Sequence, residues 1–136
     1  VARLVTLIEL ERRAAATLAS GARFSSGGEA REFTDLQGDS VAHVAALERL
    51  VERADGTPPP EPDVPVAAFV RDPESARVAS LTIADRLVRA YLDAIELSGS
   101  GERRRELTTL LANIAQRQLV LGGIREASPN LAASRG

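Results

Sequence analysis

The sequence predicts an all-α fold, a bundle of four helices, on three observations. Four segments of the chain repeat apolar residues with a period close to that of an α-helix. Clusters of Gly, Pro, Ser and Asp separate these segments. Hydrophobic residues make up 44% of the 136 residues, with abundant Ala and Leu and only 3% aromatic residues, a composition typical of closely packed helices.

The first two helices are expected at about residues 2–19 and 26–54. Ser20-Gly21 is expected to end the first helix, because Gly tolerates the left-handed conformation that follows many helix C-termini. Ser26 and Glu29 have the spacing of a capping box, which predicts the start of the second helix. The residues expected to face inward are Leu4, Leu7, Ile8, Ala14, Ala15 and Leu18, then Phe33, Leu36, Val44, Leu47, Leu50 and Val51.

Asp72-Pro73 predicts the start of the third helix, with Asp as N-cap and Pro at the first helical position. Ser98-Gly99 ends it, and a fourth helix is expected from about Ser100 to a stop at Ser128-Pro129. The residues expected to face inward are Val78, Leu81, Val88, Tyr91, Leu92 and Ile95, then Leu107, Leu110, Leu111, Ile114, Leu121 and Ile124.

The link between the second and third helices reads TPPPEPDVPVAAFVR from Thr57 to Arg71, and its prolines exclude a helix. In an extended form, at about 3.1 Å per residue, this link can run the length of a bundle. We expect it to lie on the outside, anchored by Val66 and Phe69. The two other links are short, so each pair should be an antiparallel hairpin. Two hairpins joined by one long Pro-rich crossover is the ferritin-like arrangement among four-helix bundles.

A single domain is expected: a bundle over residues 1–127, with the crossover at 56–72, followed by a C-terminal tail at 128–136. The net charge is −2 and the basic residues are dispersed, so no nucleic-acid partner is predicted. No apolar run approaches the roughly 18 residues of a membrane span. The absence of Cys excludes disulfides and zinc–thiolate sites.

Polar residues interrupt the apolar face of each helix near its middle, and they predict a polar layer in the core. Carboxylate-bridged di-iron bundles place a Glu on two helices and a Glu-x-x-His pair on the other two. Here Ser40 and Ala115 occupy the Glu positions of the two pairs, and Gln118 replaces the second His. The residues of the predicted layer are Glu11, Ser40, His43, Asp85 and Gln118.

Two interpretations of this layer stay open. In the favoured one, Glu11 and His43, the chain's single His, form a hydrogen-bonded network, because a buried charged group needs a partner. In the other, Glu11, His43 and Asp85 hold one divalent ion, iron or another metal, as facial triads do. A lone His in a predicted core with no Ser motif beside it does not favour hydrolytic catalysis.

The chain resembles a group of actinobacterial ferritin-like domains of unknown function and, more distantly, the general bacterial ferritin-like domain family. The resemblance is carried by Glu11 with Ala14-Ala15-Ala16, by His43 with Ala45-Ala46-Leu47, by Gly56-Thr57-Pro58-Pro59-Pro60, by Asp72-Pro73-Glu74-Ser75-Ala76-Arg77, and by Ala90-Tyr91-Leu92. It implies a ferritin-like fold that often lacks iron ligands, in proteins commonly assigned to the cell envelope. Metal-binding relatives would place ligands at Glu11, Ser40, His43, Ala84 or Asp85, Ala115 and Gln118.

The favoured function is a non-catalytic helical domain with a structural or partner-binding role and a degenerate metal site. The alternatives are a metal-binding ferritin-like protein that handles iron or oxidants, and a small-molecule carrier with a cavity at the bundle waist. Leu119 and Val120 are expected to point away from the core, beside Gly122 and Gly123. They predict a docking face on the fourth helix for a second copy of the chain or for another protein.

Overall fold

A computed structural model describes the backbone of residues 1–99 and 101–126 and the side chains as far as residue 123. This part of the chain contains four helices and no strand: α1 (Ala2–Phe24), α2 (Gly27–Arg53), α3 (Pro73–Glu96) and α4 (Gly101–Glu126). The predicted all-α fold with four helices is therefore confirmed. The expected tail at 128–136 and the expected stop at Ser128-Pro129 lie outside the described residues.

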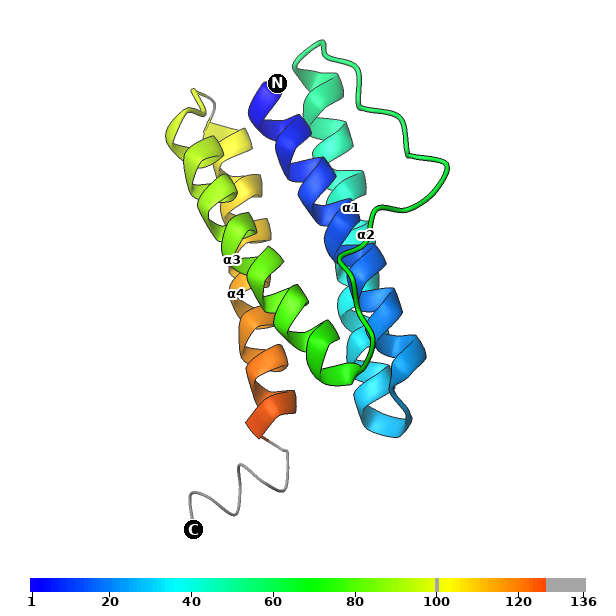
Figure 1. Ribbon diagram of the computed structural model, residues 1–136. Helices are drawn as coiled ribbons and strands as arrows, with labels where there is room; N and C mark the ends of the chain where they lie inside the picture. Colours follow the sequence, from blue (N-terminus) through cyan, green and yellow to red (C-terminus); the bar gives the residue numbers. More distant parts are fainter. Residues whose placement is uncertain (100, 127–136) are drawn as a thin grey trace.

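The four helices lie side by side as a bundle (Figure 1). α1 packs against both α2 and α3, and α3 packs against α4, whereas α2 and α4 touch at few positions. The buried apolar residues form two clusters, a larger one that includes Leu7, Leu47 and Leu87 and a smaller one around Phe33 and Leu121. Within the described residues no helix is long and apolar enough to cross a membrane, as the sequence predicted.

The crossover between α2 and α3 contains no helix, which confirms the prediction, and it runs from one end of the bundle to the other (Figure 1). The predicted anchors are wrong, because Phe69 is 85% exposed and Val66 is 60% exposed. The half-buried Ala68 and Val70 pack against the core instead. Alternate residues of an extended chain face opposite sides, so Ala68 and Val70 turn inward where Phe69 turns outward.

Two hydrogen bonds fasten the crossover to α1. The backbone N–H of Ala68 donates to the hydroxyl oxygen of Thr17 over 3.0 Å. A guanidinium nitrogen of Arg12 donates to the carbonyl oxygen of Pro60 over 3.1 Å. The small side chain of Ala68 allows the extended backbone to approach α1. The two hydrogen bonds then hold the crossover against this helix.

α1 continues past Ser20-Gly21 to Phe24, so the predicted helix end at that position is wrong. Gly21 is buried, and a Cβ atom there would lie 2.8 Å from ring carbons of Phe33. A contact of that length is a steric clash, so a helical glycine at this position gives the Phe33 ring room to pack against α1. This glycine serves helix packing instead of helix termination.

α2 begins where the sequence predicted, with Ser26 as its N-cap, but the predicted capping box does not form. The Ser26 side chain makes no capping hydrogen bond, and the Ser25 hydroxyl lies 3.2 Å from a carboxylate oxygen of Glu29. Gly27, the first residue of α2, has a φ of 57°, a value that most other residues rarely adopt. This turn geometry places Ser25 instead of Ser26 beside Glu29.

The start of α3 agrees with the prediction. The backbone N–H of Ser75 donates to an Asp72 carboxylate oxygen over 2.7 Å, and the N–H of Asp72 donates to the Ser75 hydroxyl oxygen over 3.1 Å. Hydrogen bonds from the backbone and side chain of Ser75 lower the pKa of the Asp72 carboxyl, because they favour its charged form. Pro73 follows as the first helical residue.

Candidate functional site

A buried polar cluster occupies the interior of the bundle, and each helix contributes one residue to it. Glu11 comes from α1, His43 from α2, Tyr91 from α3 and Arg117 from α4. We call these four residues the waist cluster. Their relative exposures are 0%, 6%, 0% and 1%, so all four side chains are inside the protein.

The Glu11 carboxylate is the centre of the waist cluster. Its Oε2 accepts hydrogen bonds from the Tyr91 hydroxyl and from Nδ1 of His43, each over 2.7 Å. Its Oε1 accepts from a guanidinium nitrogen of Arg117 over 3.2 Å. A carboxylate only accepts hydrogen bonds, so Nδ1 of His43 carries the proton of this contact. The prediction that Glu11 and His43 meet within hydrogen-bonding distance is confirmed.

The electrostatics of the waist cluster favour a charged carboxylate. Burial alone raises the pKa of Glu11, but the hydrogen bond from His43 and the positive charge of Arg117 outweigh it, so the pKa lies below 4.5. Burial and the adjacent Glu11 charge raise the pKa of Tyr91, which keeps its phenol protonated as a donor. The cluster is therefore a desolvated ion pair whose acceptor has two further donors.

Two members of the predicted polar layer lie elsewhere. Asp85 is exposed and accepts a hydrogen bond from the amide of Gln118 over 2.8 Å, on the outside of the bundle. The predicted layer is wrong at both positions, and the predicted inward face of α3 is wrong at Val78 and Leu92, which are about half exposed. Successive residues of a helix differ by about 100°, so an error of one residue turns a side chain out of the core. Ala84 and Arg117, the neighbours of Asp85 and Gln118, are the buried residues.

Ser40 lies in the core as predicted, but it does not join the waist cluster through a hydrogen bond. Its hydroxyl oxygen is buried and has no hydrogen-bond partner among the described residues. The Nε and Nη1 atoms of Arg117 are also buried and have no hydrogen-bond partner among the described residues. The hydrogen bond from Arg117 to Glu11 is made by the remaining guanidinium nitrogen, Nη2.

The residues of the waist cluster do not fit a metal ion. The described part of the chain has no group of three His, Cys, Asp or Glu side chains placed to hold one. The candidate ligands Glu11 and His43 are together, but Asp85 is on the surface. Both oxygens of Glu11 already accept hydrogen bonds, and the Arg117 guanidinium puts a positive charge where a cation would have to approach.

The register of the buried positions shows how this site differs from the di-iron pattern. The buried pair three residues apart on α4 is Ile114 and Arg117, instead of Ala115 and Gln118. On α2 the corresponding buried pair is Ser40 and His43. Arg117, a cation built into the chain, is the buried residue of this α4 pair that contacts Glu11.

Sequence reasoning missed the roles of Tyr91 and Arg117, although signals for both were present. Tyr91 was expected in the core as an apolar residue, but a buried Tyr hydroxyl needs a hydrogen-bond partner and so indicates a polar neighbour. Arg117 lies three residues after Ile114 and four before Leu121, which is the spacing of the inner face. An Arg at such a position indicates a buried carboxylate partner.

In comparisons with known proteins, no family model matches this chain and no curated protein matches it at a significant level.

Proposed function

We propose that this chain is a non-catalytic helical domain of the ferritin-like kind, with a structural or partner-binding role. The observation that supports this most directly is that Glu11 accepts hydrogen bonds from His43, Tyr91 and Arg117 inside the core. Three hydrogen bonds occupy most of the roughly four lone-pair positions of a carboxylate, which leaves Glu11 little capacity to act as a metal ligand or a general base. In this proposal the waist cluster is the remnant of a metal site that now serves the packing of the bundle.

The course of the chain supports the ferritin-like part of the proposal. Two residues join α1 to α2, and these helices pack closely, so we infer an antiparallel hairpin. The link between α3 and α4, positions 97–100, is also short and these helices also pack together, so we infer a second hairpin there. A crossover that runs the length of the bundle then brings the chain back to start α3, which is the ferritin-like connection (Figure 1).

A metal titration tests the non-catalytic role. Purified protein is mixed with Fe²⁺ without oxygen, binding is followed by calorimetry, and iron oxidation is followed after air is admitted. We expect neither saturable binding nor faster oxidation than with Glu11→Gln. Stoichiometric binding that Glu11→Gln abolishes and Glu9→Gln preserves would favour the alternative, a ferritin-like protein that handles iron. Glu9 is the matched control because it is an exposed carboxylate on the same helix.

The partner-binding role rests on the outer face of α4. Leu119 is 70% exposed, while the half-buried Val120 packs against the smaller apolar cluster. A Cβ atom on Gly122 or Gly123 would meet nothing within 4 Å among the described residues. Sedimentation of wild type and Leu119→Glu over a range of concentrations tests whether α4 holds a homodimer. A monomer at every concentration in both proteins would count against the homodimer and point to cover of this face by the chain itself.

A further inference from the structure

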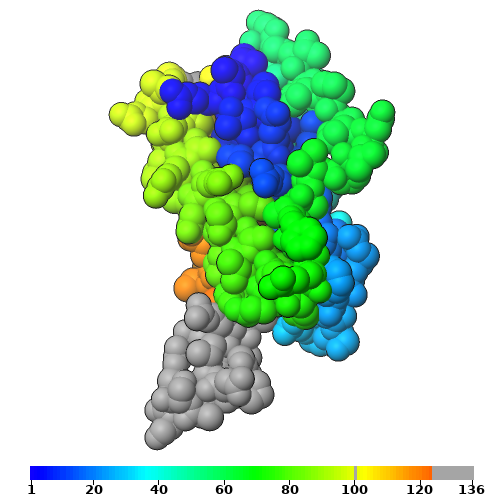
Figure 2. Space-filling model, viewed as in Figure 1, coloured from blue at the N-terminus to red at the C-terminus, as the bar shows by residue number. Residues whose placement is uncertain are grey.

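A cavity of about 490 Å³ lies between α1 and the crossover, separate from the waist cluster. Leu10 and Arg13 of α1 line one wall, and Pro59, Pro62, Pro65 and Val66 of the crossover line the other. The crossover lies beside α1 on the face seen in Figure 2. The volume is in the range of small-molecule sites, and the walls are mainly apolar with a few charged groups, as in such sites.

The two arginines at this cavity differ in their partners. Arg12 donates to the Pro60 carbonyl oxygen, and its other terminal nitrogen lies 3.5 Å from the Glu48 carboxylate. Arg13 makes no side-chain hydrogen bond or ion pair with any described residue, and its buried Nε lacks an acceptor. A partly desolvated guanidinium without an acceptor favours an anionic ligand, because its charge-assisted hydrogen bonds are strong.

We propose that this cavity binds a small amphiphilic anion, a molecule with an acyclic or cyclic apolar body and one carboxylate or similar group. The anionic group lies at Arg13, and the apolar body lies between Leu10 and the prolines. Glu9 and Glu61 also line the cavity, so a ligand with a single negative charge is favoured over a polyanion.

The walls of this cavity are held in place before a ligand arrives. Proline fixes its own φ angle, so Pro59, Pro62 and Pro65 have little freedom to lose on binding. The bonds from Arg12 to Pro60 and from Ala68 to Thr17 fasten the crossover to α1. A preformed site loses less conformational entropy when it is filled, which favours affinity for a small ligand.

Octanoate is the probe for the test, and 1-octanol is its uncharged counterpart. Backbone amide shifts of the labelled full chain are followed during each titration. We expect saturable shifts with octanoate at Leu10, Arg13 and Val66, and at least about tenfold weaker binding of octanol, which lacks the charge-assisted bond. Equal affinity for both probes, or no saturable shift at the cavity with octanoate, would overturn the proposal.

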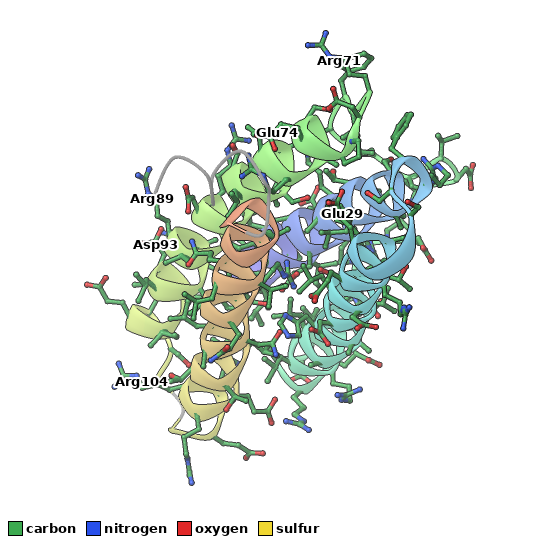
Figure 3. The ribbon with its side chains drawn as sticks, turned by 90° about the horizontal axis from the view of Figure 1, so that it is seen from below. Glu29, Arg71, Glu74, Arg89, Asp93 and Arg104 are labelled. Atoms are coloured by element: carbon green, nitrogen blue, oxygen red, sulfur yellow. The ribbon has the colours of Figure 1, made fainter. Side chains whose placement is uncertain are left out.

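Three variants that each remove one charge sharpen the test. Arg13→Gln should weaken octanoate binding at least about tenfold, and Glu9→Gln should strengthen it, because a like charge has been removed. Arg89→Gln is the control, since Arg89 points away from the bundle on α3 (Figure 3). Unchanged octanoate affinity in Arg13→Gln would overturn the assignment of this cavity. If Arg13→Gln does not fold, the comparison of octanoate with octanol on the wild type decides.

Discussion

Arg117 and Arg13 carry the same side chain in two different surroundings. Arg117 is 1% exposed and its guanidinium contacts the Glu11 carboxylate, whereas Arg13 is half-buried at the edge of a cavity and makes no ion pair with a described residue. An arginine inside a bundle needs a counter-charge from the chain itself, because desolvation of an unpaired ion costs several kcal/mol. An arginine that keeps contact with water needs no such counter-charge, because water solvates its guanidinium. The comparison separates a charge that stabilises the bundle from a charge that is available to a ligand.

The largest effect is expected from Arg117→Met, which leaves Glu11 buried without its cation. Loss of one partner of a buried pair should lower the free energy of unfolding by about 3–5 kcal/mol. Urea unfolding followed by circular dichroism measures it. The double variant Glu11→Leu, Arg117→Met should lose clearly less than the sum of the two single changes, because no unpaired charge remains. Additive losses would show that the two residues do not interact.

The second expectation concerns acid. The pKa of folded Glu11 lies below 4.5, its value in the unfolded chain, so its contribution to stability is complete above about pH 4.5. That contribution is lost as the pH falls through the folded pKa, because Glu11 is then protonated in the folded protein as well as in the unfolded chain. The stability difference between wild type and Glu11→Gln should therefore be constant near neutral pH and shrink in acid. Urea unfolding at a series of pH values measures it, and a constant difference down to pH 2 would contradict it.

A smaller effect is expected from His43→Leu. This change removes one of the three donors to Glu11 and leaves Tyr91 and Arg117 in place. The free energy of unfolding should fall by about 1–3 kcal/mol, the cost of a lost buried hydrogen bond. A neutral or stabilising result in thermal unfolding would mean that the Glu11–His43 contact adds nothing to the bundle.

The smallest effect is expected from Arg13→Met, the counterpart of Arg117→Met. Arg13 makes no ion pair with a described residue, and methionine can replace the apolar stem of its side chain. The free energy of unfolding should change by no more than about 0.5 kcal/mol. A loss of unfolding free energy similar to that of Arg117→Met would contradict the proposed difference between the two arginines.

The sequence was sufficient for the four helices, the long crossover, the Asp72-Pro73 start of α3 and the meeting of Glu11 with His43. The sequence was insufficient where a shift of one residue determines whether a helical side chain faces the core or the solvent. Asp85 and Gln118 each lie one position from a buried residue, and apolar residues on both sides of α3 and α4 blurred the inner face. Gly21 was misassigned because the Phe33 ring that needs its space comes from another helix, which no local pattern reveals.

The waist cluster is divided between the two helix pairs: Glu11 and His43 belong to α1 and α2, whereas Tyr91 and Arg117 belong to α3 and α4. Apolar surfaces alone tolerate many relative positions, because one leucine can replace another as a neighbour. A slip of one helical turn, about 5.4 Å, would separate Glu11 from Arg117 and leave two opposite charges stranded in the interior. The cluster therefore favours one register of the two helix pairs, the one in which the Glu11 carboxylate contacts the Arg117 guanidinium.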